Sequence, residues 1–152
     1  MNDRILLVED EENDVFFMQR AMKKAGLHPP HVVIDGQAAI DFLKEIIDRD
    51  RKELPGLVLL DLKLPRVMGF DVLTWIRQQP ELRDLTVIIL TSSKLSSDIE
   101  SAYERGANSY LVKPNTSVGL QHIVEGIKKC IGQDQPTALG MLRTLSEMSL
   151  TQ

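Results

Sequence analysis

Five short runs of apolar residues recur along the chain, separated by longer stretches with a different periodicity. The runs cover residues 5–8, 31–34, 57–60, 87–90 and 109–112. Within each run the apolar residues are largely continuous and do not alternate with polar ones, which is typical of strands buried on both faces of a parallel sheet. The pattern therefore predicts five strands, most of them in the interior of the molecule.

Between the runs, apolar residues recur at three- and four-residue spacing, which is typical of amphipathic helices. These stripes cover residues 15–25, 39–47, 72–76, 99–103 and 120–131. Gly26 and Gly106 provide helix stops, and Pro80 closes the third stripe. Five strands that alternate with five helices predict an α/β fold, an open and doubly wound parallel sheet with helices on both faces.

Polar side chains follow four of the predicted strands directly. Glu9 and Asp10 follow the first strand, Asp61 the third, Thr91 the fourth and Lys113 the fifth. In an open α/β sheet, ligands bind outside the carboxyl ends of the strands. We therefore expect three carboxylates, a hydroxyl and an ammonium to meet in one crevice.

Such a crevice suggests phosphoryl transfer. Converging carboxylates repel one another unless a cation joins them, and Mg²⁺ with oxygen ligands fits best. One oxygen of Asp61 would then be free as a nucleophile, and carboxylates are known to accept phosphoryl groups. Lys113 and Thr91 are residue types that can stabilise charge on a transferring group.

Composition and charge exclude several classes of protein. The chain has 152 residues and a formal net charge of −4, which argues against a dedicated DNA-binding protein. Its apolar runs are far shorter than the ~20 residues of a membrane span, so no membrane association is expected. One cysteine, Cys130, cannot form an internal disulfide. With no visible signal peptide, we expect a cytoplasmic protein.

The residues at the strand ends resemble those of the response-regulator receiver domains, which are also called chemotaxis-regulator-like domains. The resemblance extends over roughly residues 4–131 and depends on Glu9-Asp10, Asp61 within LLDLKLP, Thr91 and Lys113-Pro114, all in the family's order. It implies a flavodoxin-like (βα)5 fold with strand order 2-1-3-4-5. It also implies a signalling protein of a two-component system, not an enzyme, which promotes only its own phosphorylation and dephosphorylation.

The resemblance assigns a role to each of these residues. Asp61 is expected to be the phosphoacceptor, supplied by the histidine of a sensor kinase, with Thr91 and Lys113 in contact with the phosphoryl group. Thr91 and the aromatic Tyr110 are expected to form a switch that responds to phosphorylation. The expected ligands of Mg²⁺ are Glu9, Asp10, Asp61 and the backbone carbonyl of Lys63.

A finer resemblance concerns partners. The segment LDLKLPRVMG and a chain without an output domain are similar to the small receivers partnered with bacterial phytochromes and related hybrid kinases. This implies a sensor histidine kinase, such as a bacteriophytochrome or hybrid kinase, as phosphoryl donor. Onward transfer to a downstream phosphotransfer protein and a homodimer formed through the side containing residues 92–131 are further expected partnerships.

Three positions depart from the commonest pattern of the family. Met68 replaces an acid before Gly69, although Gly69 retains access to positive φ. Lys63 places a positive charge two residues after Asp61, and the small Ser93 would leave the site open to attacking water.

Two other functions remain as alternatives. An adaptor of receiver shape would bind partners without phosphorylation, but it has no physical need for clustered acids. An aspartyl-phosphate phosphatase would resemble Asp-x-Asp at its nucleophile, where this chain has Lys63, and no cap domain is expected to shield a substrate.

The chain is expected to divide into a receiver domain, residues 1–132, and a C-terminal extension, residues 133–152. Leu139, Leu142, Leu145 and Met148 fall at three-residue steps in the extension. They are consistent with a short amphipathic helix that docks on the domain, on a second copy or on a kinase, and equally with a flexible tail.

Overall fold

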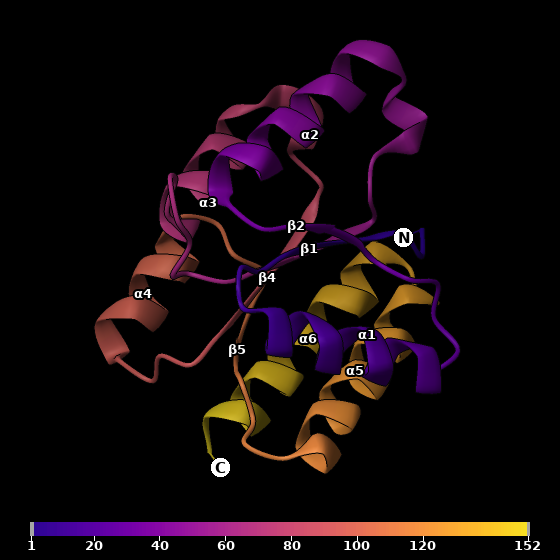
Figure 1. Cartoon of the computed structure of the whole chain (residues 1–152), viewed down its shortest axis with the longest axis vertical. Helices are drawn as coiled ribbons and strands as arrows, with labels where there is room; N and C mark the ends of the chain where they lie inside the picture. The colour runs from indigo at the N-terminus through magenta and orange to yellow at the C-terminus, as the bar shows by residue number, and fades with distance from the viewer. Residues whose placement is uncertain (1, 152) are drawn as a thin grey trace.

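A five-stranded parallel sheet forms the centre of the molecule (Figure 1). The computed structural model describes residues 2–151. Its strands are β1 (Ile5–Val8), β2 (His31–Val33), β3 (Leu57–Leu60), β4 (Thr86–Thr91) and β5 (Ser109–Val112). Every neighbouring pair is parallel, and the spatial order is β2-β1-β3-β4-β5. The predicted flavodoxin-like fold and its strand order are confirmed.

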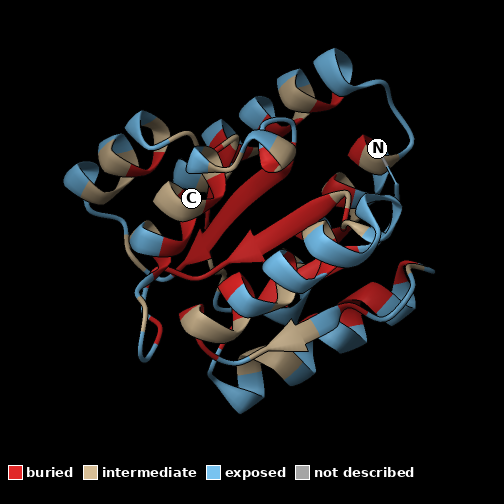
Figure 2. Ribbon diagram, turned by 90° about the horizontal axis from the view of Figure 1, so that it is seen from above, coloured by how far each residue is buried: buried red, intermediate tan, exposed pale blue. Residues whose placement is uncertain are grey.

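In the described part of the chain, six α-helices cover the two faces of the sheet (Figure 1). One face carries α2 (Gly36–Arg49), α3 (Gly69–Gln78) and α4 (Ser96–Glu104), and the other carries α1 (Glu12–Lys24), α5 (Ser117–Ile131) and α6 (Gln135–Leu150). Short 3₁₀ turns at Arg51–Glu53 and Pro80–Leu82 precede β3 and β4. Figure 2 shows the consequence for burial, with buried strands between helices whose outer faces are exposed. No helix within residues 2–151 is long and apolar enough to cross a membrane.

Four of the five strands are buried along their whole length, as their continuous apolar sequences predict. Strand β2 is the exception, because His31 is exposed and Val32 and Val33 are only half-buried. The interpretation of this run as a strand buried on both faces is therefore wrong. The physical reason is its place at the edge of the sheet, beside β1 alone. There the His31 ring stacks on Phe42 of α2 with a 4.1 Å distance between ring centroids.

Helix α6 lies along strand β5 at the other edge of the sheet. Ala138 and Leu142 are fully buried in the core shared with α1 and α5. The hydroxyl of Ser146 donates to the backbone carbonyl of Tyr110 at 2.6 Å and lies 3.3 Å from its N–H. Ser149 accepts from the N–H of Val112 at 2.9 Å. Serine hydroxyls thus satisfy backbone groups that an adjacent strand would otherwise pair.

Replacement of Ser146 by Ala is expected to lower the free energy of unfolding by about 2 kcal/mol, since it leaves the buried backbone groups of Tyr110 without a partner. Urea denaturation monitored by circular dichroism measures the change. The matched control is Thr144→Ala, an exposed position on the same helix, with an expected change within ~0.5 kcal/mol. Equal stability of the two variants would contradict the structural role of the Ser146 hydroxyl.

Candidate functional site

The polar residues at the strand ends lie together at one edge of the sheet. They follow β1, β3 and β5, and Thr91 is the last residue of β4. The backbone holds them in register, since Asp61 donates its N–H to the carbonyl of Val8 at 3.1 Å and Lys113 donates to that of Thr91 at 2.8 Å. Glu9, Asp61 and Thr91 are 4, 6 and 1% exposed. Apolar strands lead directly into these residues, which explains why polar side chains are buried here.

Three carboxylates of this crevice can share one cation. Ligand oxygens of Glu9, Asp10 and Asp61 all lie within 4.8 Å of one another. Glu9 and Asp61 are buried, whereas Asp10 is exposed. An all-oxygen, anionic site with one open side fits a hard divalent cation that retains some of its waters. The residues present therefore fit the metal site expected from the sequence.

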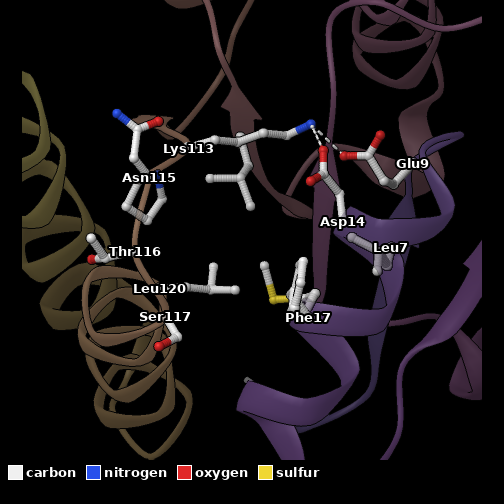
Figure 3. A pocket seen from close by; sticks show the side chains of 12 residues that line it. Leu7, Glu9, Asp14, Phe17, Lys113, Asn115, Thr116, Ser117 and Leu120 are labelled. Carbon is white, nitrogen blue, oxygen red and sulfur yellow. Dashed lines mark hydrogen bonds and ion pairs between the residues drawn. The ribbon is translucent and has the colours of Figure 1, made fainter.

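Lys113 extends from the end of β5 to the carboxylates of Glu9 and Asp14 (Figure 3). Its Nζ lies 2.5 Å from Glu9 Oε1, and donates at 2.8 Å to Asp14 Oδ2 and at 2.8 Å to Asp61 Oδ2. Burial alone would favour the neutral amine, but the three hydrogen bonds outweigh it and raise the pKa of Lys113. The ammonium therefore remains charged beside Asp61.

Glu9 is the acid most affected by its surroundings. Burial raises the pKa of Glu9, and the charge of Asp61 adds to the increase, while the hydrogen bond from Lys113 opposes it. The resulting pKa is about 7. A perturbed carboxyl group beside a second buried carboxylate is typical of a functional site.

Comparison with known proteins agrees with this geometry. The family model described as "Response regulator receiver domain" matches residues 5–125. The chain belongs to this receiver family. Its members are signalling proteins of two-component systems, as the sequence predicted.

Several relatives resemble the receiver over most of its length. "Probable methanogenesis regulatory protein FilR2" of Methanothrix harundinacea is 39% identical over 82% of this chain and 81% of its own. Response regulator Rcp1 of Synechocystis is 37% identical over 82% of this chain and 85% of its own. The structure of the phosphorylated cyanobacterial phytochrome response regulator RcpA superposes with a TM-score of 0.76 at 32% identity, covering 85% of this chain and 93% of that one. This receiver is therefore related to phytochrome response regulators.

A relative also bears on the metal site. The Mn²⁺-bound structure of Rcp1 superposes on this receiver with a TM-score of 0.73 at 36% identity, covering 82% of this chain and 91% of that one. Together with the cluster of Glu9, Asp10 and Asp61, it supports a site for a divalent cation.

The predicted switch residues of the receiver lie on adjacent strands. Thr91 ends β4 and pairs in register with Val112 of β5. Tyr110 is fully buried, and its hydroxyl donates to the backbone carbonyl of Ser93 at 2.9 Å. Burial raises the pKa of Tyr110, which keeps the phenol protonated as a donor. One hydrogen bond thus links β5 to the loop that directly follows Thr91.

The three departures from the family pattern lie around the crevice. Lys63 is exposed, and its N–H lies 3.4 Å from Asp61 Oδ1. Met68 is 55% exposed and precedes α3. The Ser93 hydroxyl donates a hydrogen bond to the carboxylate of Asp98 at 2.5 Å. This contact connects the β4–α4 loop to the first turn of α4.

Gly69 is required for close packing behind Asp61. A Cβ atom at this position would lie 2.2 Å from the backbone oxygen of Asp61 and 2.7 Å from Cα of Leu62. Gly69 does not have a positive φ. The glycine is therefore needed here for the close approach of two backbone segments, and not for the positive φ considered from the sequence. The close approach cannot be inferred from a sequence, because it depends on where α3 begins relative to the β3–α3 loop.

Gly69→Ala is expected to lower the free energy of unfolding by about 2–3 kcal/mol, because backbone atoms must shift to admit the methyl group. Gly140→Ala is the matched control within α6, where an added Cβ meets nothing within 4 Å. There we expect stabilisation of up to about 1 kcal/mol, since alanine favours helix interiors. Thermal unfolding of both variants measures the difference, and a stable Gly69→Ala protein would refute the close approach.

Two features of the site were not predicted. Asp14 follows β1 together with several other acids and was not expected to belong to the site, yet it accepts a hydrogen bond from Lys113. A cavity of about 360 Å³ beside this pair lies between α1 and α5, with Phe17, Met18 and Leu120 among its lining residues (Figure 3). A sequence signal for Asp14 was its place in the first turn of α1, at the edge of the crevice.

Proposed function

We propose that this receiver is the phosphoacceptor of a two-component phosphorelay, and that Asp61 takes a phosphoryl group from the histidine of a sensor kinase. The observation that carries the proposal is the convergence of buried Asp61 with the Glu9 and Asp10 carboxylates and the Lys113 ammonium. If these acids were only a solvated helix N-terminus, their carboxylates would be exposed and would not contact a lysine from the end of another strand.

The transfer is a displacement at phosphorus. An oxygen of Asp61 forms the new O–P bond while the N–P bond of the phosphohistidine breaks, and its electron pair returns to the imidazole, which then takes a proton from solvent. Lys113 is placed to donate to oxygens of the transferring group, since it already donates to Asp61 at 2.8 Å. Thr91, at the end of the adjacent strand, supplies the hydroxyl expected to contact the same group.

We propose Mg²⁺ as the cation of the site. Glu9, Asp10 and Asp61 would hold it, and the carbonyl of Lys63 would complete the protein ligands. When bound, the cation would neutralise charge on the phosphoryl oxygens. Hard oxygen ligands with room for waters favour Mg²⁺ among divalent cations.

The output of phosphorylation is altered protein binding. Contact of Thr91 with the phosphoryl group would shift the β4–α4 loop, and the hydrogen bond from Tyr110 to Ser93 would transmit the shift to β5. Helix α4 and the buried strand β5 therefore form the proposed switch.

The phytochrome response regulators among the relatives favour a bacteriophytochrome or hybrid kinase as the donor. A downstream phosphotransfer protein would be the next acceptor. A homodimer through the side containing residues 92–131 must accommodate α6, because α6 lies against β5 on that side.

The adaptor and phosphatase alternatives lack comparable support. Lys63 occupies the position at which a phosphatase would need its second acid, and its side chain is exposed. A phosphorylation-independent adaptor leaves the buried Glu9 and Asp61 unexplained, since buried carboxylates without a task are costly.

Intact mass after incubation with acetyl phosphate tests the proposal. We expect a gain of one phosphoryl group in the presence of Mg²⁺. Chelation of divalent cations with EDTA is expected to slow the gain at least tenfold, because Lys113 alone must then offset the carboxylates. Absence of any gain with Mg²⁺, from both acetyl phosphate and a phosphorylated sensor kinase, would favour the adaptor.

A further inference from the structure

Asp14 is the carboxylate of the crevice that has no assigned role. It lies in the first turn of α1, its side chain is 42% exposed, and Oδ2 accepts a hydrogen bond from Lys113 Nζ at 2.8 Å. Lys113 itself is only 16% exposed. Figure 3 shows the lysine side chain at the edge of the cavity between α1 and α5, with its ammonium at the Asp14 and Glu9 carboxylates.

The three partners of Lys113 differ in what else they can bind. Glu9 and Asp61 belong to the group of carboxylates whose oxygens can hold one cation, whereas Asp14 lies outside that group. Within residues 2–151, Asp14 is thus the one carboxylate partner of Lys113 that a cation in this cluster would leave available.

We propose that Asp14 is a positioning residue, which holds the ammonium of Lys113 at the phosphoacceptor while Glu9 and Asp61 bind the cation. The inference rests on the proposed phosphoacceptor function of Asp61. Asp14 itself would touch neither the metal nor the phosphoryl group, and it would act only through Lys113.

The flexibility of lysine makes such an anchor necessary. Its ammonium has three donors on a four-carbon stem with many rotamers, so it must be restrained to serve as an oriented donor. The stem of Lys113 borders the cavity with the apolar side chains of Leu7, Leu90 and Leu120, which do not orient the ammonium. With one hydrogen bond to Asp14 retained, the other two donors can face the phosphoryl oxygens.

A favourable effect on the helix terminus is the alternative explanation for an acid at this position. Acids in the first turn of a helix interact favourably with its dipole, and Glu12 lies in the same turn. Glu12 is exposed and forms no ion pair among the described residues. Glu12→Gln therefore removes the same charge from the same turn without removing a contact to Lys113, and it is the matched control.

The test compares wild type, Asp14→Asn, Asp14→Glu and Glu12→Gln as full chains with saturating Mg²⁺. The rate of mass gain from acetyl phosphate is expected to fall about five- to tenfold in Asp14→Asn, because the amide oxygen can still accept from Lys113 but only in a neutral hydrogen bond of about half the strength. Asp14→Glu is expected to recover part of the rate, and Glu12→Gln to stay within about twofold of wild type.

A second measurement does not depend on phosphorylation. The rate at which an amine-acylating reagent modifies Lys113, followed by peptide mass spectrometry in excess Mg²⁺, reports how firmly its ammonium is held. We expect faster modification in Asp14→Asn and a wild-type rate in Glu12→Gln, because only the first variant releases the lysine.

The outcomes separate this inference from the proposed function. Equal rates for Asp14→Asn and wild type in both measurements would overturn the role of Asp14, and so would equal effects of Asp14→Asn and Glu12→Gln. If wild type gains no phosphoryl group from either acetyl phosphate or a phosphorylated sensor kinase, the proposed function fails, and the modification rate of Lys113 alone decides whether Asp14 anchors it.

Discussion

Asp61→Asn is expected to abolish phosphoryl uptake, with no detectable mass gain under conditions in which the native chain gains one phosphoryl group. The amide has no anionic oxygen to attack phosphorus, so the loss concerns the nucleophile itself. The substitution also removes one carboxylate from the cluster with Glu9 and Asp10 and weakens any cation site there. Intact mass spectrometry after incubation with acetyl phosphate and Mg²⁺ measures the effect.

The control for this variant is Asp71→Asn. Asp71 is an exposed acid in the first turn of α3, outside the metal-binding group. It is expected to be phosphorylated at the native rate. Phosphorylation of the Asp61→Asn protein to the native extent would place the acceptor elsewhere and remove the basis for every role assigned around it.

Arg77→Met is expected to cause the largest loss of stability among the variants considered, about 3 kcal/mol in the free energy of unfolding. Arg77 extends from α3, and its guanidinium donates to groups in two connections, the one between α3 and β4 and the one between α4 and β5. The acceptors are the backbone carbonyls of Leu82, Leu85 and Gly106 and the side-chain oxygen of Asn108, at 2.8–3.2 Å. Burial lowers the pKa of Arg77, which indicates how far these contacts are removed from water.

Methionine retains much of the aliphatic volume of Arg77 but leaves these acceptors without a donor. Denaturant titration with circular dichroism measures the change, and Arg83→Met, at an exposed position nearby, is the control with an expected change within ~0.5 kcal/mol. Equal stability of the two variants would mean that the loops hold their conformation without the guanidinium. These loops precede β4 and β5. The destabilisation caused by Arg77→Met is therefore expected to extend to these two strands, which position Thr91 and Lys113.

The apolar pattern of the sequence was sufficient to predict most of the fold. The strands at 5–8, 57–60 and 109–112 were predicted to the residue, because each is a buried run that is apolar throughout or, with Ser109, at all but its first position. Strand β4 is two residues longer than predicted, since Thr86 and Thr91 are polar residues that the core nevertheless buries. Burial of β2 was overestimated, because composition does not distinguish an edge strand from a central one.

The residues of the candidate site that directly follow strands could be predicted from the sequence. Residues that end apolar runs in a parallel sheet must meet at one edge, and so Glu9, Asp61 and Lys113 could be brought together without coordinates. The contact between Asp14 and Lys113 could not, because it depends on the path of α1 after β1 and spans 99 residues of sequence.

The sequence by itself thus determined the alternation of strands and helices, the receiver family and the acids, lysine and threonine of the crevice. These depend on local periodicity and on residues whose places are set by the ends of strands. Only the tertiary structure decided the rest. It placed α6 along β5 through Ser146, joined the α3–β4 and α4–β5 connections through Arg77, and brought Asp14 to Lys113. Each of these contacts connects residues far apart in the chain or in different elements, and no periodic pattern encodes such distances.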